Sequence, residues 1–145
     1  MSECCEMPDH NPSGESIRKL LREAKRIAIV GLSDKPDRDS HMVARYLQRQ
    51  GYEIIPVNPV LKGEVLGARV YASLAEVPGP IDIVDVFRRP EAVPAIVKEA
   101  IAIKARAVWM QAGIAHNEAA REGEAAGLEV VQSKCIKVEH AMLLG

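Results

Sequence analysis

Aromatic residues are scarce in this sequence. They make up 3% of its 145 residues and include one Phe and one Trp. The interior must therefore be built mainly from Ile, Val, Leu and Ala, a composition typical of parallel sheets covered by helices. The scarcity of aromatic rings, together with a formal net charge of −1, argues against nucleic-acid binding, which uses basic surfaces and rings that stack on bases.

Long apolar segments and a cysteine framework are also missing. No apolar run approaches the ~20 residues of a membrane-spanning helix, and residues 1–14 lack the apolar segment of a signal peptide. The three cysteines are an odd number, and Cys4 and Cys5 are adjacent, unlike a secreted disulfide framework. We therefore expect a cytoplasmic protein that does not bind membranes. Cys4, Cys5 and His10 suggest a metal site, but they lack a fourth ligand.

The distribution of polar and apolar residues predicts one domain and a tail. Residues 1–14 are polar, with two prolines, and predict a flexible tail; residues 15–145 are expected to form one domain. Apolar residues at helical spacing predict helices over residues 15–25, 40–50, 91–103 and 117–126, with a helical turn over 74–77. A final helix is expected to pack on the sheet through Cys135, Val138 and Met142.

Short apolar runs predict five strands, and their alternation with helices predicts the fold class. The runs cover residues 26–31, 52–57, 81–86, 106–110 and 128–132, whereas residues 60–73 predict a loop with a short extended piece. The expected architecture is α/β, a Rossmann-like doubly wound parallel sheet with right-handed crossovers and helices on both faces. Counted along the chain, the expected strand order is 3-2-1-4-5. Ligands bind such sheets where the order reverses, here between the first and fourth strands.

The end of the first predicted strand has the features of an anion site. Gly31 ends the strand, and a polar loop leads to a helix that begins near Ser40. Backbone N–H groups and the helix dipole at such a helix start favour an anion, and Ser33, Lys35 and Arg38 are residues that bind phosphate. Because Gly31 is the only glycine of the turn, the pattern is neither a dinucleotide fingerprint nor a Walker loop. An ordinary strand-to-helix loop is the alternative.

The ends of the next strands add polar groups on the same edge. Asn58-Pro59 stands where NAD-binding folds place an acidic residue, and Lys62 follows, although a lysine binds a ribose phosphate less well than an arginine. Phe87-Arg88-Arg89-Pro90 follows the third strand, where two arginines favour an anionic ligand. Gln111-Ala112-Gly113 after the fourth strand offers backbone donors. A plain turn, solvated arginines and a core position for Phe87 are the alternatives.

No catalytic constellation stands out in the predicted domain. None of its histidines lies near a Ser or Cys nucleophile in a known pattern; they are His41, His116 and His140. Asp82 and Asp85 are three residues apart on one strand, so their side chains are expected on opposite faces and cannot act as a pair. Cys135, at the start of the last helix, is either a reactive thiol or an inert core residue.

Five of these segments, taken together, resemble a known family. They are Ile-Val-Gly-Leu-Ser-Asp-Lys-Pro, Val-Asn-Pro, Ile-Val-Asp-Val-Phe-Arg-Arg-Pro, Val-Trp-Met-Gln-Ala-Gly-Ile and Lys-Cys-Ile-Lys-Val-Glu-His. In this order they resemble the small stand-alone CoA-binding proteins, whose fold is similar to the N-terminal CoA-binding domain of the succinyl-CoA synthetase alpha subunit. The resemblance covers residues 17–144 and leaves out the tail.

The resemblance implies that the protein binds coenzyme A, free or acylated, at the carboxyl ends of the strands. Ligase chemistry does not carry over, because the domains that carry the synthetase's phosphohistidine and bind its nucleotide are missing. The implied contacts are Gly31, Leu32, Ser33, Lys35, Pro36 and Arg38 for the phosphates, Val57, Asn58, Pro59 and Lys62 for the adenosine end, Phe87, Arg88 and Pro90 along the ligand, and Gln111, Ala112 and Gly113 beside the pantetheine.

Two other functions stay open at this point. One is an enzyme on the same scaffold that uses NADP or an acyl-CoA, with Cys135 or His41 taking part. The other is a regulatory or interaction domain whose nucleotide site is degenerate. The sequence also leaves open which protein partner is bound, if any, and whether the protein is a homodimer.

Overall fold

The computed structural model describes residues 6–145, and five parallel strands form its main sheet. The strands are β1 (Arg26–Val30), β2 (Glu53–Val57), β5 (Ile83–Val86), β6 (Ala107–Met110) and β7 (Glu129–Val131). The helices are α1 (Gly14–Glu23), α2 (Asp39–Arg49), α3 (Val93–Ala102), α4 (Asn117–Ala125) and α5 (Ile136–Leu143), with short 3-10 helices η1 (Leu74–Glu76) and η2 (Pro90–Ala92). Between β2 and β5, β3 (Glu64–Val65) and β4 (Ala68–Arg69) form an antiparallel hairpin.

The Rossmann-like α/β class is confirmed, but the predicted strand order is wrong. The order is β2-β1-β5-β6-β7, which is 2-1-3-4-5 when the five strands are counted along the chain. The connection from β2 to β5 buries Leu74 of η1 on the face covered by α3, whereas α2 covers the opposite face. Right-handed crossovers over opposite faces run in opposite directions, so β5 lies on the far side of β1. The order therefore reverses between β1 and β5.

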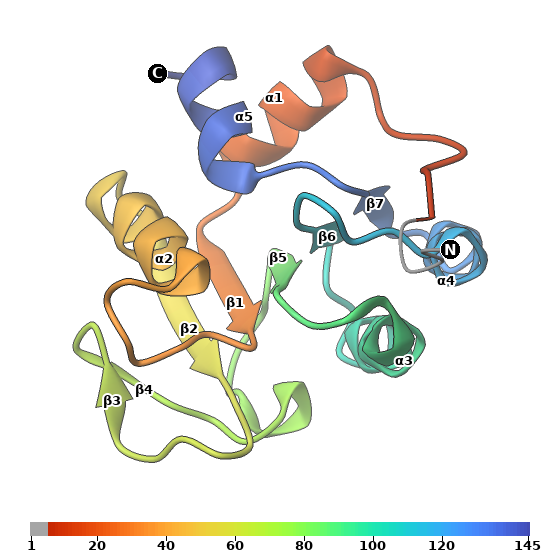
Figure 1. Ribbon diagram of the computed structural model, residues 1–145. Helices are drawn as coiled ribbons and strands as arrows, with labels where there is room; N and C mark the ends of the chain where they lie inside the picture. The colour runs from red at the N-terminus through yellow and green to blue at the C-terminus, as the bar shows by residue number, and fades with distance from the viewer. Residues whose placement is uncertain (1–5) are drawn as a thin grey trace.

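Each face of the sheet carries its own core. Ala28 and Val30 of β1 face one core, which η1, α3 and α4 cover. Ile27 and Ile29 face the other, which α1, α2 and α5 cover, and Figure 1 shows these two helix layers on either side of the sheet. Trp109 is fully buried in the second core, and its Nε1 donates to the Lys134 carbonyl at 2.7 Å.

The last helix forms as predicted, but with a different face inward. Val138 is 48% exposed and Met142 is 72% exposed, while Ile136 and His140 are buried. The Tyr46 hydroxyl and His140 Nδ1 are hydrogen-bonded at 2.9 Å, and burial lowers the pKa of His140. Apolar residues lie on more than one face of α5, so their spacing alone does not say which face packs. The expectation that Val138 and Met142 face the sheet is wrong.

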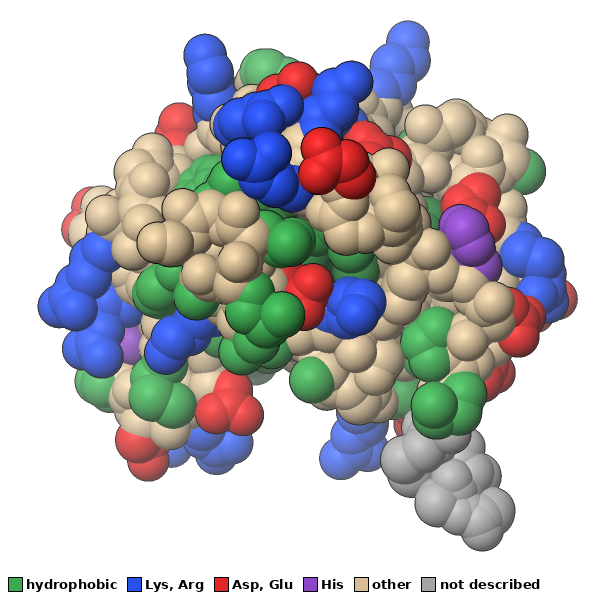
Figure 2. All heavy atoms as spheres, turned by 90° about the horizontal axis from the view of Figure 1, so that it is seen from above, with side chains coloured by type: hydrophobic (Ala, Val, Ile, Leu, Met, Phe, Trp, Pro, Cys, Tyr) green, Lys and Arg blue, Asp and Glu red, His purple; other side chains and the backbone are tan. Residues whose placement is uncertain are grey.

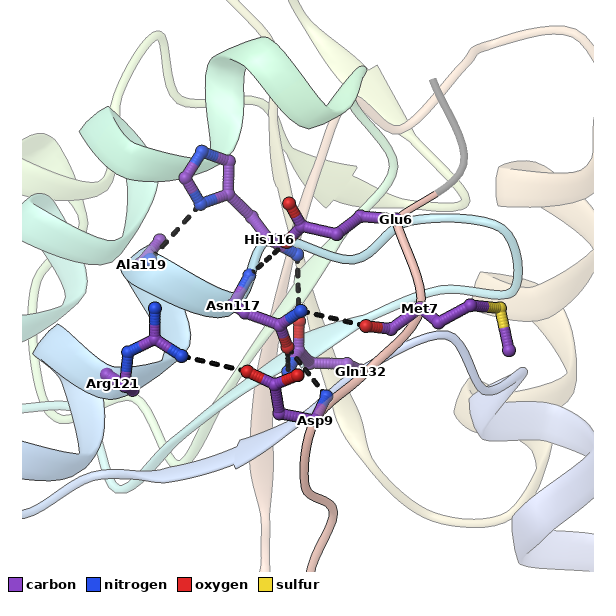
Figure 3. A network of polar contacts seen from close by, with 8 residues as sticks. All are labelled: Glu6, Met7, Asp9, His116, Asn117, Ala119, Arg121 and Gln132. Atoms are coloured by element: carbon purple, nitrogen blue, oxygen red, sulfur yellow. Dashed lines mark hydrogen bonds and ion pairs between the residues drawn. The ribbon is translucent and has the colours of Figure 1, made fainter. Parts of the chain in front are cut away.

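The described part of the predicted tail, residues 6–13, is hydrogen-bonded to α4 (Figure 3) and to Gln132 just after β7. The Asn11 side chain donates to the Gln132 carbonyl at 3.0 Å and accepts from the Gln132 N–H at 2.7 Å. Asn11 thus pairs with the end of the outer strand β7 as a neighbouring strand would. Asp9 accepts from Arg121 at 2.8 Å. Side-chain amides thus satisfy backbone groups at the edge of the sheet, and the division into a flexible tail and one domain stays a prediction.

Two sequence-based hypotheses concern metal and membrane. Cys4 and Cys5 lie outside the described residues, and residues 6–145 contain no group of His, Cys, Asp and Glu suited to a metal ion. None of the helices in that same stretch is long and apolar enough to cross a bilayer.

Candidate functional site

The turn after β1 packs directly on the turn after β5. Gly31 has φ +92° and donates its N–H to the Val57 carbonyl at 2.9 Å. A Cβ at this position would collide with the carbonyl oxygen of Phe87 and lie 3.0 Å from the Arg88 side chain. Glycine is therefore required by the approach of two chain segments as well as by its positive φ.

The loop from β1 to α2 is held by its own polar groups. The Ser33 N–H donates to Ser40 Oγ at 3.0 Å, and the Lys35 N–H donates to Ser33 Oγ at 3.1 Å. His41 Nδ1 lies 2.9 Å from the Ser33 carbonyl oxygen. Leu32 is fully buried beneath the loop. The loop conformation is thus set before any ligand binds.

The N-terminus of α2 opens into a hollow of about 380 Å³, which we call the α2 hollow. Its lining includes Gly31, Ser33, Arg38, Ser40 and Phe87, together with Asp37 and Asp39. No side chain caps this helix end, so its backbone N–H groups and the positive end of the dipole face the hollow, which favours an anion. The two aspartates oppose an anion, so binding needs cations as well.

Cations are present at this edge of the sheet. The side chains of Lys35, Arg38, Lys62 and Arg88 are exposed, and none forms an ion pair with another residue among 6–145. By contrast, Arg106 at the opposite end of the sheet is paired with Glu23 at 2.9 Å and Glu129 at 3.0 Å, contacts that raise its pKa despite partial burial. The cations at the carboxyl edge remain available to a ligand.

A second hollow, the hairpin hollow, measures about 520 Å³ and lies beside β3 and β4. Pro59, Lys62 and Arg69 line it, with Glu64 and Glu76 also present. The Asn58 side chain is hydrogen-bonded within the protein. It donates to the Leu32 carbonyl at 3.0 Å and accepts from the Val60 N–H at 2.9 Å. Its side chain thus joins the ends of β1 and β2.

A third hollow lies between α2 and α5, measures about 440 Å³ and is called the α2–α5 chamber here. It is lined by Asp39, Met42, Val43, Phe87, Gln111, Ala112, Ile114, Cys135, Lys137 and Val138. Phe87 and Asp39 also line the α2 hollow, so the two hollows adjoin.

The structure sorts the predicted contact residues into three groups. Those that line one of the three hollows are Gly31, Ser33, Arg38, Pro59, Lys62, Phe87, Gln111 and Ala112. Leu32 and Val57 are buried in the cores. The others line none of the three hollows; five lie on loops and Pro90 begins η2, and they are Lys35, Pro36, Asn58, Arg88, Pro90 and Gly113.

Sequence reasoning missed several residues of the site. Met42 and Val43 were not among the predicted contacts, and both line the chamber. Ser40 was seen only as a helix start, whereas its Oγ holds the loop. The signal for Ser40 was its place at the end of a loop that begins with Gly31, because a serine at a helix start often bonds to nearby backbone.

Three titratable groups outside the three hollows are held within the structure. His116 Nδ1 accepts from the Ala119 N–H at 3.1 Å as the N-cap of α4. Asp82 accepts from the Lys25 and Arg26 N–H groups at 2.8 and 2.9 Å. Asp85 is fully buried on β5, and neither carboxylate oxygen has a hydrogen-bond partner among the described residues. Burial raises the pKa of Asp85 well above its ordinary value.

Comparison with known proteins adds relatives of closely similar length. The chain is 48% identical over 132 residues to the uncharacterized protein YneT of Bacillus subtilis, covering 91% of this chain and 97% of that protein. Among solved structures, a hypothetical protein from Pyrococcus horikoshii OT3 is 39% identical with a TM-score of 0.90 over 100% of both chains. A Thermus thermophilus protein is 40% identical with a TM-score of 0.88, covering 92% of this chain and 100% of that one.

A more distant similarity shows the fold alone. The dinucleotide-forming acetyl-coenzyme A synthetase 1 of Ca. Korarchaeum cryptofilum matches with a TM-score of 0.63 at 19% identity, over 73% of this chain and 25% of that one. The model of the CoA binding domain family matches residues 25–141, a span that includes β1, β2, β5, β6 and the loops that line the three hollows. The chain therefore belongs to the CoA binding domain family.

Proposed function

We propose that the protein binds coenzyme A along the carboxyl edge of its sheet, with the pyrophosphate in the α2 hollow. The observation that carries this proposal is the N-terminus of α2, which no side chain caps and which faces a hollow beside the unpaired cations Lys35, Arg38 and Arg88. A pyrophosphate accepts hydrogen bonds from the free N–H groups, and the helix dipole and the three cations offset the repulsion from Asp37 and Asp39. Membership of the CoA binding domain family supports the same ligand.

The two remaining hollows suit the two ends of the ligand. In this proposal the adenosine end and its 3′-phosphate lie in the hairpin hollow, where Lys62 and Arg69 supply positive charge. The pantetheine arm passes Phe87 toward the loop of Gln111 and Ala112, residues that line the α2–α5 chamber. The hairpin hollow adjoins the end of β2, the α2 hollow adjoins β1, and the chamber adjoins β5 and β6. The three hollows thus follow one another along the carboxyl edge of the sheet, as an extended ligand requires.

We propose binding without chemistry supplied by the protein. In residues 6–145 no histidine is hydrogen-bonded to a Ser or Cys side chain. The half-buried Cys135 in the chamber favours one alternative, an enzyme that uses acyl-CoA. Release of free thiol from acetyl-CoA by the protein, abolished in Cys135→Ala, would establish that enzyme and overturn a pure binding function.

Calorimetric titration with coenzyme A tests the proposal. We expect saturable binding to the unmodified protein and about fivefold weaker binding to Arg38→Gln, because an exposed charged contact is worth about 1 kcal/mol. Arg45→Gln is the matched control, since Arg45 is exposed on the same helix and lines none of the three hollows. Absence of heat with millimolar coenzyme A would refute the proposal and favour a domain with a degenerate nucleotide site.

A further inference from the structure

The α2–α5 chamber differs in chemistry from the α2 hollow that it adjoins. Seven of its lining residues are apolar or weakly polar: Met42, Val43, Phe87, Ala112, Ile114, Cys135 and Val138. The α2 hollow is lined mainly by Ser, Asp and Arg. An apolar wall offers little to a phosphate or a sugar, but it stabilises a hydrocarbon group by removing that group from water.

The two cavities share Phe87 and Asp39, so one ligand can occupy both. Such a ligand must carry an anionic group at one end and an apolar group at the other. The chamber volume of about 440 Å³ lies within the range of cavities that hold small organic ligands.

Gln111 places one polar group in the chamber wall. Its side chain is 5% exposed, and its Oε1 accepts from the Ile136 N–H at 3.2 Å. Its amide nitrogen makes no hydrogen bond to any residue of the described part of the chain. Among the described residues the only fully buried side-chain nitrogen or oxygen atoms without a partner are the two Asp85 carboxylate oxygens, so the unpaired Gln111 nitrogen reaches the surface, where it can donate to a ligand carbonyl.

The outer face of α5 continues the apolar surface beyond the chamber. Val138 lines the chamber and is 48% exposed, and Met142, one turn further along, is 72% exposed. Figure 2 looks down on the side of the molecule where α1 and α5 lie, and it shows apolar side chains exposed between charged ones. Neither Val138 nor Met142 is needed to fill the core, because Ile136 and His140 face inward instead.

We propose that the chamber receives the thioester end of an acyl-CoA, with the apolar acyl chain against Phe87, Met42 and Val138. The Gln111 amide N–H donates to the thioester carbonyl. This inference rests on the proposed function, and it names the substrate class as coenzyme A thioesters of apolar acyl groups. The competing occupant is the pantetheine arm alone, in which case the acyl group stays in solvent.

A chain-length series distinguishes these occupants. Dissociation constants are measured by calorimetry for coenzyme A and its acetyl, butyryl, hexanoyl and octanoyl thioesters. We expect about fourfold tighter binding for each methylene that the chamber buries, with a plateau when it is full. Equal affinity across the series would overturn the inference while the proposed function stands. Binding of neither coenzyme A nor octanoyl-CoA would overturn both.

Substitutions on α5 test where the acyl chain binds. Val138→Lys should lower the ratio of octanoyl-CoA affinity to coenzyme A affinity at least tenfold, because a charged side chain replaces part of the apolar wall. Met142→Lys is the matched control on the same helix, since Met142 is exposed and lies outside the chamber lining, and it should leave the ratio unchanged. An equal ratio in both variants would refute the placement on α5.

The role of Gln111 has its own test. Gln111→Glu keeps the acceptor for the Ile136 N–H but loses the donor that we assign to the thioester carbonyl. Binding of octanoyl-CoA should weaken more than binding of its octyl thioether, which has no carbonyl. Equal weakening of the two ligands would show that Gln111 does not contact the thioester.

Discussion

Asp85 should make the protein less stable at neutral pH than an apolar residue in its place. It lies on the central strand β5, opposite Ile29 and Trp109 in the register, and both carboxylate oxygens lack partners among the described residues. Asp85→Leu replaces them with methyl groups of similar shape. Because a buried polar group without a partner costs ~1–3 kcal/mol, we expect a gain of that order, and more where the carboxyl would be ionised in the unfolded chain.

The stability difference between Asp85→Leu and the unmodified protein should depend on pH. Burial raises the pKa of Asp85 in the folded protein, whereas the unfolded chain has the ordinary value of ~3.9. The folded state therefore binds more protons, and stability falls as pH rises from ~4 up to the folded pKa. The Asp85→Leu variant has no carboxyl group at this position, so its stability does not fall with pH for this reason. Its advantage should grow with pH by up to ~1.4 kcal/mol per pH unit in that interval and become constant above the folded pKa.

Urea denaturation followed by circular dichroism between pH 4 and pH 8 measures both stabilities. Asp82→Leu is the control on the same segment, and it should destabilise, because Asp82 accepts from two backbone N–H groups at 2.8 and 2.9 Å. If Asp85→Leu is destabilised by an amount that does not vary with pH, then Asp85 has a partner or a structural role that its surroundings do not show, and the reasoning fails.

Three further predictions concern the ligand and the fold. A hundredfold excess of coenzyme A over its Kd should stabilise the protein by ~2.7 kcal/mol and raise its melting temperature by several degrees in a thermal-shift assay; NAD should not, because Asn58, whose amide is bound to Leu32, replaces the usual carboxylate. Dephospho-CoA should bind more weakly than coenzyme A in calorimetry, and added salt should reduce this difference in affinity. Equal affinities for the two ligands would show that Lys62 does not contact the 3′-phosphate. Gly31→Val should lower the melting temperature without any ligand, because its Cβ meets the Phe87 carbonyl; an unchanged value would contradict the packing of the two turns.

The sequence by itself determined the local elements and the place of the candidate site. Helices and strands followed from apolar spacing, which reflects the 3.6-residue and 2-residue periods of the backbone. Pro94 lies in the first turn of α3, and Gly51 and Gly127 with positive φ follow α2 and α4, as backbone sterics predict. The loops that line the hollows follow strand ends, and parallel strands bring their carboxyl ends to one edge.

The tertiary structure alone decided which elements became neighbours. The strand order depended on which face of the sheet the connection through Leu74 crosses, and residues 58–82 carry no helix long enough to show this in sequence. The inward face of α5, and the lack of a partner for Asp85 among residues 6–145, likewise depend on what packs against them from distant segments. The α2–α5 chamber joins residues from positions 39 to 138. Local sequence carries the backbone preferences, whereas long-range packing assigns each side chain its surroundings.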